Sequence, residues 1–106
     1  MFSSPVRTVL VSDLDPAAPI APGTTLLDVR EQDEWDAGHA PGALHIPLGE
    51  LPRRIAEIPV DGRIVVVCRS GSRSARATAW LEQGGYEAAN LDGGMLAWAG
   101  AGLPVV

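Results

Sequence analysis

Cys68 is the residue whose chemistry and surroundings point most directly to a function. It is the only cysteine among 106 residues, and it follows an unbroken β-branched run at 64–67. A thiolate is a strong nucleophile, and nearby positive charge promotes its formation. Three of the eight basic residues, all of them arginine, come soon after it: Arg69, Arg73 and Arg76. In a chain with a net charge of −5, this concentration predicts that a small anion meets the thiol.

The six residues after Cys68, which we call the cysteine loop, are suited to hold a negative charge. They are Arg69, Ser70, Gly71, Ser72, Arg73 and Ser74. Gly71 can adopt a positive φ, and the small serines let the backbone curl so that successive N–H groups form a nest for an anion. Helix N-termini and cations lower a thiol pKa from about 8.5 to about 3.5–7.5. We therefore expect Cys68 to be a thiolate at neutral pH.

Both features also have a plainer interpretation. A lone cysteine after a valine run is typical of an inert side chain in a hydrophobic core, and the arginines could be only the solvated face of a helix start. On the cysteine alone, the inert interpretation is the stronger one. The glycine and the two arginines of the cysteine loop favour the reactive thiol, because an inert core position has no need of them.

Apolar segments that alternate with helical ones must position this loop. Strands are expected at residues 6–11, 25–29, 43–46, 64–67 and 88–91. Helices are expected at residues 31–37, 48–58, 74–83 and 95–99. This alternation predicts an α/β fold, a small open parallel sheet of about five strands with helices on both faces. The strand at 64–67 should be central, because an unbroken β-branched run suits a strand covered on both sides.

The position of Cys68 in this sheet indicates where a ligand would bind. Open parallel sheets bind ligands at the carboxyl ends of their strands, where loops lead into helix N-termini. Cys68 follows the central strand, so we expect its thiol at the mouth of the domain. The segment 13–23, which contains Pro16, Pro19 and Pro22, should be irregular.

Length and composition limit the class of protein. With 46% hydrophobic residues, 106 residues suffice for one compact domain, residues 1–106, and are too few for two. No apolar run approaches the ~20 residues of a membrane span, and residues 1–11 lack the features of a secretory signal. The negative net charge argues against a nucleic-acid or anionic-membrane partner, and a single cysteine cannot form an intramolecular disulfide. We therefore expect a soluble protein of the reducing cytoplasm.

Three segments, in the right order, resemble the signatures of rhodanese-like domains. The first comprises Leu26-Leu27-Asp28-Val29-Arg30-Glu31, Glu34-Trp35, Gly38-His39-Ala40-Pro41-Gly42-Ala43 and Ile46-Pro47. The second is residues 64–74, and the third comprises Leu91-Asp92-Gly93-Gly94-Met95, Ala97-Trp98 and Gly102-Leu103-Pro104. Residues 1–24 precede the resemblance as a divergent N-terminal strand and proline-rich loop, where many relatives carry a helix.

The resemblance implies a sulfurtransferase that moves a sulfane sulfur from thiosulfate or a persulfide to cyanide or a biological thiol. Cys68 would carry the sulfur as a persulfide. The cysteine loop would bind the anionic donor through its amides and through Arg69 and Arg73. Such covalent catalysis needs no metal or organic cofactor. Asp28, Arg30 and His39 are expected to support the site.

Metal binding is not expected. His39, His45 and Cys68 do not show the spacing of metal ligands. The partners that the resemblance implies are a small anionic sulfur donor, a thiol or cyanide acceptor, and a sulfur-acceptor protein.

Other functions are compatible with the same nucleophile. A persulfide carrier or redox-signalling module without turnover of thiosulfate would need Cys68 equally. Related phosphatases of the dual-specificity, cell-cycle type have a loop one residue longer than the span from Cys68 to Arg73, and position 74 here is Ser rather than Arg. A tighter cradle suits sulfur better than a tetrahedral phosphate, so phosphatase or arsenate reductase chemistry is the lesser prediction. The presence of Cys68 and its basic loop disfavours an inactive interaction domain.

Overall fold

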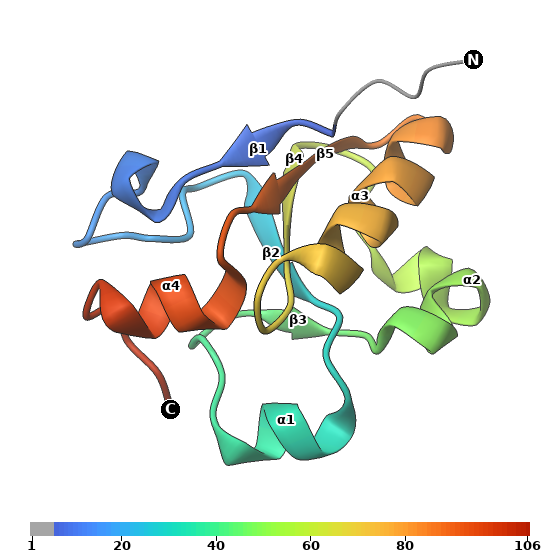
Figure 1. Ribbon diagram of the computed structural model, residues 1–106. Helices are drawn as coiled ribbons and strands as arrows, with labels where there is room; N and C mark the ends of the chain where they lie inside the picture. The colour runs from blue at the N-terminus through green and yellow to red at the C-terminus, as the bar shows by residue number, and fades with distance from the viewer. Residues whose placement is uncertain (1–5) are drawn as a thin grey trace.

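A computed structural model describes residues 6–106 and contains a five-stranded parallel sheet (Figure 1). The strands are β1 (Thr8–Val9), β2 (Thr24–Asp28), β3 (Leu44–His45), β4 (Arg63–Val67) and β5 (Glu87–Leu91). Their order is β1-β5-β4-β2-β3, and every neighbouring pair is parallel. The prediction that the β-branched strand is central is confirmed, since β4 lies between β5 and β2. Residues 1–5, part of the N-terminal segment discussed above, lie outside the described residues.

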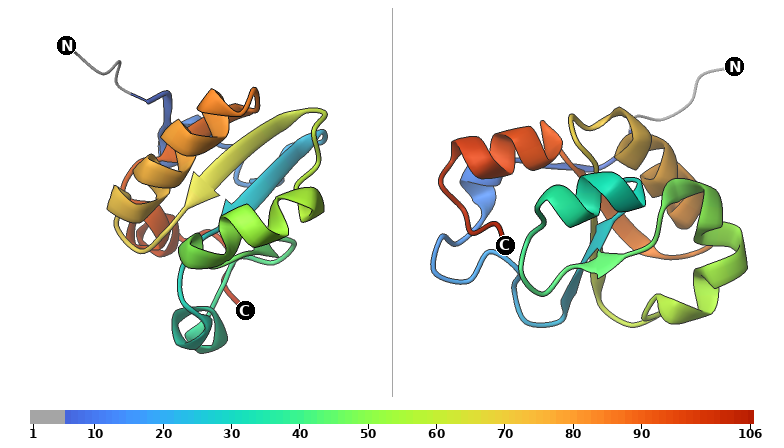
Figure 2. Two further views of the ribbon diagram at one scale, coloured as in Figure 1. Left: turned by 90° about the vertical axis from the view of Figure 1, so that its right-hand side faces the viewer. Right: turned by 90° about the horizontal axis from the view of Figure 1, so that it is seen from below.

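Within residues 6–106, four α-helices connect and cover the strands: α1 (Gln32–Ala37), α2 (Leu51–Arg54), α3 (Ser72–Gln83) and α4 (Gly94–Gly100). In Figure 1, α2 and α3 lie on one side of the sheet and α4 lies on the other. The right-hand view of Figure 2 looks onto the end of the sheet where α1 lies. The α/β fold with helices on both faces is therefore confirmed. None of the helices within residues 6–106 has both the length and the apolar composition that a transmembrane span requires.

Neighbouring residues of each inner strand point to opposite faces and so enter two separate hydrophobic clusters. On the face of α2 and α3, Leu27 and Val66 pack with Leu81 and with Cys68 itself. On the other face, Leu26 and Val65 belong to the cluster that contains Trp98 of α4. Because both of its faces are buried, β4 is apolar from Ile64 to Val67.

The first strand is shorter than the apolar run at 6–11 predicts. Val11 belongs instead to a 3-10 turn, η1 (Val11–Asp13). The backbone N–H of Leu10 donates to Oδ2 of Asp13 at 3.0 Å, and the N–H of Asp13 donates to the Leu10 carbonyl at 2.9 Å. These two bonds turn the chain away from the sheet edge, so the prediction for Val11 was wrong.

The helix expected at 48–58 was also wrong as a single element. It consists of three short pieces: η2 (Leu48–Glu50), α2 and η3 (Ile55–Glu57). Pro52 lies in the first turn of α2 and has no N–H to donate to an earlier carbonyl. The apolar spacing still has its effect, because Leu51 and Ile58 are buried and Ile55 packs against them.

Beyond Asp13, the last residue of η1, the proline-rich segment 13–23 contains no helix and only an isolated bridge between Asp15 and Ala18, as its composition predicts. Leu14 and Ile20 pack against the second hydrophobic cluster and so help to cover the sheet in place of a helix.

Candidate active site

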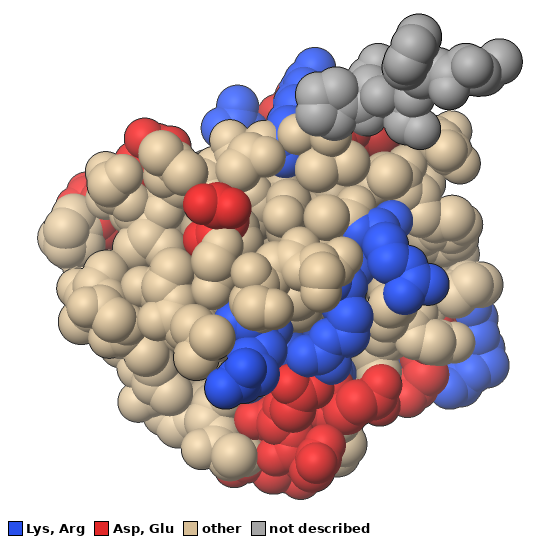
Figure 3. Space-filling view, viewed as in Figure 1, with Lys and Arg blue, Asp and Glu red and all other residues tan. Residues whose placement is uncertain are grey.

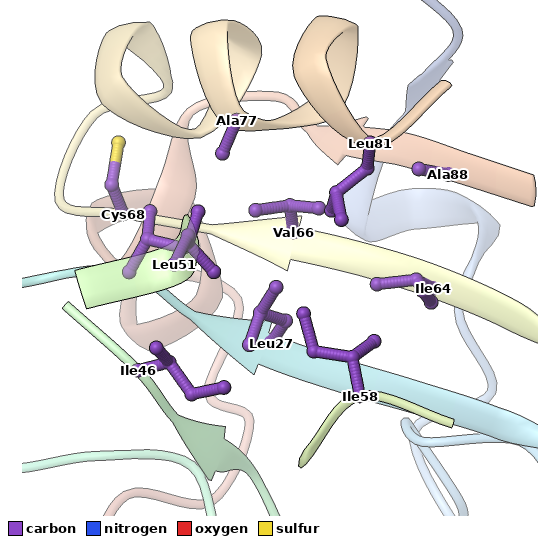
Figure 4. Close-up of a cluster of buried hydrophobic side chains, with 11 residues drawn as sticks. Leu27, Ile46, Leu51, Ile58, Ile64, Val66, Cys68, Ala77, Leu81 and Ala88 are labelled. Atoms are coloured by element: carbon purple, nitrogen blue, oxygen red, sulfur yellow. The ribbon is translucent and has the colours of Figure 1, made fainter. Parts of the chain in front are cut away.

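Cys68 lies at the carboxyl end of β4, between the sheet and the first turn of α3. Figure 4 shows it at the margin of the buried cluster, with its sulfur directed away from Leu51 and Ile46. The residue is 1% exposed, and the thiol is free. The expected position at the carboxyl end is confirmed, but the thiol lies beneath the cysteine loop rather than open at a mouth.

Three hydrogen bonds converge on the Cys68 sulfur from the loop and from α3. The N–H of Gly71 lies 3.1 Å from Sγ, the N–H of Ser74 lies 3.4 Å from it, and the Ser74 hydroxyl lies 3.2 Å from it. Burial raises the pKa of the thiol, but these donors and the Ser70 N–H outweigh it, so the pKa of Cys68 is lowered. An inert core cysteine would not be surrounded by donors in this way.

The backbone conformation of Gly71 makes this arrangement possible. Gly71 is the N-cap of α3 and has a φ of 114°, which an L side chain rarely adopts. Its N–H turns toward Sγ, and the helix that follows directs the N–H of Ser74 at the same atom. The sulfur thus lies at the positive end of a 12-residue helix.

The loop carbonyls are held from outside by the start of α4. The N–H of Met95 donates to the Cys68 carbonyl at 2.8 Å, and the N–H of Leu96 donates to the Arg69 carbonyl at 3.1 Å. Gly94 has a φ of 56° and packs so closely that a Cβ there would collide with both carbonyls. With those carbonyls bound to α4, the loop N–H groups are left to face the sulfur.

The three arginines near Cys68 differ in their surroundings. Arg73 donates from both terminal nitrogens to Glu34 of α1, at 2.6 and 2.8 Å. The hydrogen bond from Arg73 lowers the pKa of Glu34 to about 2, so this carboxylate is ionised at neutral pH. Arg69 and Arg76 are exposed and form no ion pair within the described part of the chain. Figure 3 shows basic side chains gathered on the face that carries α3, bordered by acidic side chains.

Asp28 and Arg30 brace the neighbouring loop rather than contact the thiol. Their side chains form a buried ion pair of 2.8 Å, and the Arg30 guanidinium also donates to the carbonyls of Glu34 and Gly38. This pair therefore ties the middle and the C-terminal end of α1 to the end of β2, and with them the residue whose carboxylate holds Arg73.

His39 lies in a different group of side chains. Its ring stacks on Trp35 with centroids 3.7 Å apart, and its Nδ1 lies 2.9 Å from the Trp35 carbonyl. His45 also stacks on Trp35, at 4.6 Å, and its Nε2 lies 2.8 Å from the Arg30 carbonyl. Within residues 6–106, neither histidine is hydrogen-bonded to Cys68, so neither is placed as a base for the thiol.

Sequence reasoning missed three residues that shape the site: Glu34 as the partner of Arg73, Gly94 as the close contact of the loop carbonyls, and Asn90. Asn90 donates from Nδ2 to the Gly71 carbonyl at 3.1 Å, and its Oδ1 lies 2.6 Å from the Ser74 hydroxyl. The available signal was a single amide inside the apolar stretch that ends β5, Ala88-Ala89-Asn90-Leu91.

Comparison with known proteins identifies the class that this fold and site define. The profile of the rhodanese-like domain matches residues 14–101, and the chain belongs to that family. A sulfurtransferase of Allochromatium vinosum is 48% identical over 82 residues, which cover 76% of this chain and 77% of that protein. The family assignment and this relative support membership of a sulfurtransferase and sulfur-carrier family.

Two solved structures extend the comparison. A rhodanese-related protein of Thermoplasma volcanium superposes with a TM-score of 0.85 at 33% identity, covering 94% of this chain and 97% of that one. The thiosulfate sulfurtransferase of Pseudomonas aeruginosa superposes with a TM-score of 0.83 at 28% identity. The match covers 95% of this chain but 19% of that protein.

Proposed function

We propose that this protein is a sulfurtransferase that carries sulfane sulfur as a persulfide on Cys68 and takes it from thiosulfate or a related persulfide donor. The observation that carries the proposal is the convergence of the Gly71 N–H, the Ser74 N–H and the Ser74 hydroxyl on one sulfur atom, at 3.1–3.4 Å. Donors aimed at a single atom stabilise negative charge there, which is what both a thiolate and a bound sulfur anion require.

The reaction divides into two displacements at sulfur. The Cys68 thiolate attacks the outer sulfur of thiosulfate, a new S–S bond forms, and sulfite leaves with the electron pair of the broken S–S bond. A nucleophilic acceptor, cyanide or a thiolate, then attacks the outer persulfide sulfur and regenerates the Cys68 thiolate. No external oxidant or reductant is needed, and the covalent intermediate replaces one difficult transfer by two easier ones.

The charges around the loop favour an anionic donor. The loop N–H groups, from Arg69 to Ser74, would hold the negative outer sulfur and the oxyanion of the donor. Arg69 adds an exposed positive charge that no carboxylate in residues 6–106 neutralises. Arg73 contributes less net charge than its position in the sequence implies, because Glu34 is bound to it. Arg69 is therefore the main cationic contact that we propose for the donor.

A recess lies beside the same loop. It has a volume of about 440 Å³ and is lined by Arg73 and Arg76 of α3, by Trp80, and by Leu48 and Pro52 of the segment opposite. We propose that a thiol acceptor, small or carried on a partner protein, approaches from this side. A single cysteine that must stay reduced to act suits a reducing cytoplasm, where we expect the protein to work.

Thiocyanate formation from thiosulfate and cyanide tests the proposal, with intact-mass measurement of the protein after thiosulfate alone. We expect one added sulfur atom per chain, its loss on addition of cyanide, and steady thiocyanate production. Cys68→Ser is the matched control and should show none of these. A wild-type protein that gains no sulfur from thiosulfate or from an alkyl persulfide would contradict the proposal.

The same measurements separate turnover from carriage. A protein that acquires the sulfur but passes it to cyanide only stoichiometrically would act as a persulfide carrier. Hydrolysis of an aryl phosphate through Cys68, without any added sulfur, would instead indicate phosphatase chemistry and contradict the loop-length argument.

A further inference from the structure

Asn90 contacts the cysteine loop from β5, a strand that contributes no residue to the proposed mechanism. It lies on β5, opposite Val66 of β4, and is 7% exposed. Its Nδ2 donates to the Gly71 carbonyl at 3.1 Å, and its Oδ1 lies 2.6 Å from the Ser74 hydroxyl. The orientation of the amide follows from these partners, because a carbonyl can only accept. Oδ1 must therefore face Ser74 as an acceptor.

The Ser74 hydroxyl has one proton and lies between two acceptors. One is Oδ1 of Asn90 at 2.6 Å, and the other is Sγ of Cys68 at 3.2 Å. When Cys68 is a thiol, both contacts are satisfied, since S–H donates to Oγ and the Ser74 hydroxyl donates to Oδ1. When Cys68 is a thiolate, it can only accept, and the single proton cannot serve both atoms.

Turning the Ser74 hydroxyl from Asn90 to the thiolate is unfavourable, because Asn90 then lacks a donor. Within residues 6–106, every buried side-chain nitrogen and oxygen has a hydrogen-bond partner. If the hydroxyl turns to the thiolate, Oδ1 of Asn90 loses the one donor that the described residues offer it, while Asn90 remains buried. A buried acceptor that is left without a donor is unfavourable. Asn90 therefore opposes the stabilisation of the thiolate by Ser74.

We propose that Asn90 is a positioning residue that competes with the Cys68 thiolate for the Ser74 hydroxyl proton. By weakening the hydrogen bond from Ser74, it keeps this thiolate more nucleophilic than its surrounding donors alone would leave it. The role rests on the proposed function. In the persulfide the negative charge lies on the outer sulfur, Sγ no longer needs the proton, and the hydroxyl returns to Asn90. The contact thus favours the loaded state over the resting thiolate.

A double-mutant cycle tests this role without any sulfur donor. Cys68 is the only cysteine, so the pH dependence of its alkylation by iodoacetamide reports its pKa alone. Asn90→Leu, which is nearly isosteric, should lower that pKa by about half a unit to one unit, and Ser74→Ala should raise it. In the Ser74→Ala background, Asn90→Leu should have no effect. The charged groups around the loop, Arg69, Arg73 and Glu34, are unchanged in all four proteins.

The cycle also distinguishes this role from simple support of the loop. An unchanged or raised pKa in Asn90→Leu would overturn the proposal. An equal shift in the Ser74→Ala background would do the same, because the effect would then pass through the Gly71 carbonyl. Asn90→Ala should shift the pKa in the same direction and replaces the leucine variant if that protein does not fold.

Sulfur loading supplies an independent measurement. A thiolate of lower pKa is a weaker nucleophile, with a Brønsted slope of about 0.4–0.5. At a pH where Cys68 is fully ionised in both proteins, Asn90→Leu should therefore load sulfur from thiosulfate about 1.6- to threefold more slowly, by the same slope. Faster loading would contradict the inference. If neither protein loads sulfur, the proposed function fails, while the alkylation result still decides the role of Asn90.

Discussion

The guanidinium of Arg73 is bound by both carboxylate oxygens of Glu34, at 2.6 and 2.8 Å, and this two-point contact ties the start of α3 to α1. Bidentate pairs of this kind fix geometry as well as charge. Arg73, five positions after the candidate nucleophile, is thus held in place by Glu34 from the first half of the chain. The strength with which the loop attracts an anion therefore depends on α1 as well as on the loop.

Glu34→Gln should increase the affinity for an anionic sulfur donor, because it frees the charge of Arg73. We expect the apparent KM for thiosulfate to fall roughly two- to fivefold at low salt, with a smaller effect at high salt. Steady-state kinetics at two ionic strengths measures this. Glu57→Gln is the matched control, since Glu57 pairs with Arg54 elsewhere on the surface. An equal fall in KM for both variants would show that only the net charge matters.

The Glu34 pair also makes stability depend on pH. The pKa of Glu34 falls from 4.5 to about 2 on folding, so the pair contributes fully above pH 4.5 and loses its contribution as the pH falls toward 2. Wild type should therefore melt at a higher temperature than Glu34→Gln near neutral pH, and the gap should close in acid. Thermal unfolding followed by circular dichroism across that range measures the gap. A gap that stays constant down to pH 2 would contradict the assignment.

Gly94→Ala should destabilise the fold and disturb the site together. Gly94 has a φ of 56°, and a Cβ there would meet the carbonyls of Cys68 and Arg69. We expect the free energy of unfolding to fall by about 2–4 kcal/mol, with loss of sulfur transfer. Gly100 lies in the same helix and has open space around it. Gly100→Ala should therefore change the free energy of unfolding by less than about 1 kcal/mol. Denaturant unfolding of both variants provides the comparison, and similar losses would contradict the close-contact argument.

Arg30→Met should be far more damaging than a comparable change at the surface. It leaves the Asp28 carboxylate, which is fully buried, without its cation. The free energy of unfolding should therefore fall by about 3–5 kcal/mol. Arg63→Met breaks the ion pair with Glu87, in which both side chains are more than half exposed. It should lower the free energy of unfolding by about 1 kcal/mol or less. Free energies of unfolding that fall equally in the two variants would rule out a bracing role for Arg30.

Much of the fold follows from short-range sequence patterns. The β-branched run identifies β4, and the glycine after Cys68 identifies the turn into α3, because both signals depend on neighbouring residues alone. The single helix expected at 48–58 was wrong for a local reason, since Pro52 interrupts the backbone bonds that the apolar spacing implies. Val11 was assigned to a strand because its hydrophobicity masked the turn formed by Asp13.

The parts of the site that sequence could not predict are long-range contacts. Glu34 and Arg73 lie 39 positions apart, and Asn90 and Ser74 lie 16 apart, so their contacts depend on sheet order and register. Asn90 pairs with Val66 in the sheet, so Asn90 lies near the end of β4. This position cannot be predicted without knowing the register of β4 and β5. The burial of Cys68 is likewise a property of the assembled loop, α3 and α4.

Titration of the Cys68 thiol in the folded and the denatured protein tests the central claim most directly. The ultraviolet absorbance of the thiolate can be followed against pH, with Cys68→Ser subtracted as background. The donors from Gly71 and Ser74 should make the folded protein ionise at a lower pH than the denatured chain, despite the burial of the residue. A folded midpoint at or above the denatured one would contradict the account, because a buried neutral thiol cannot start the transfer.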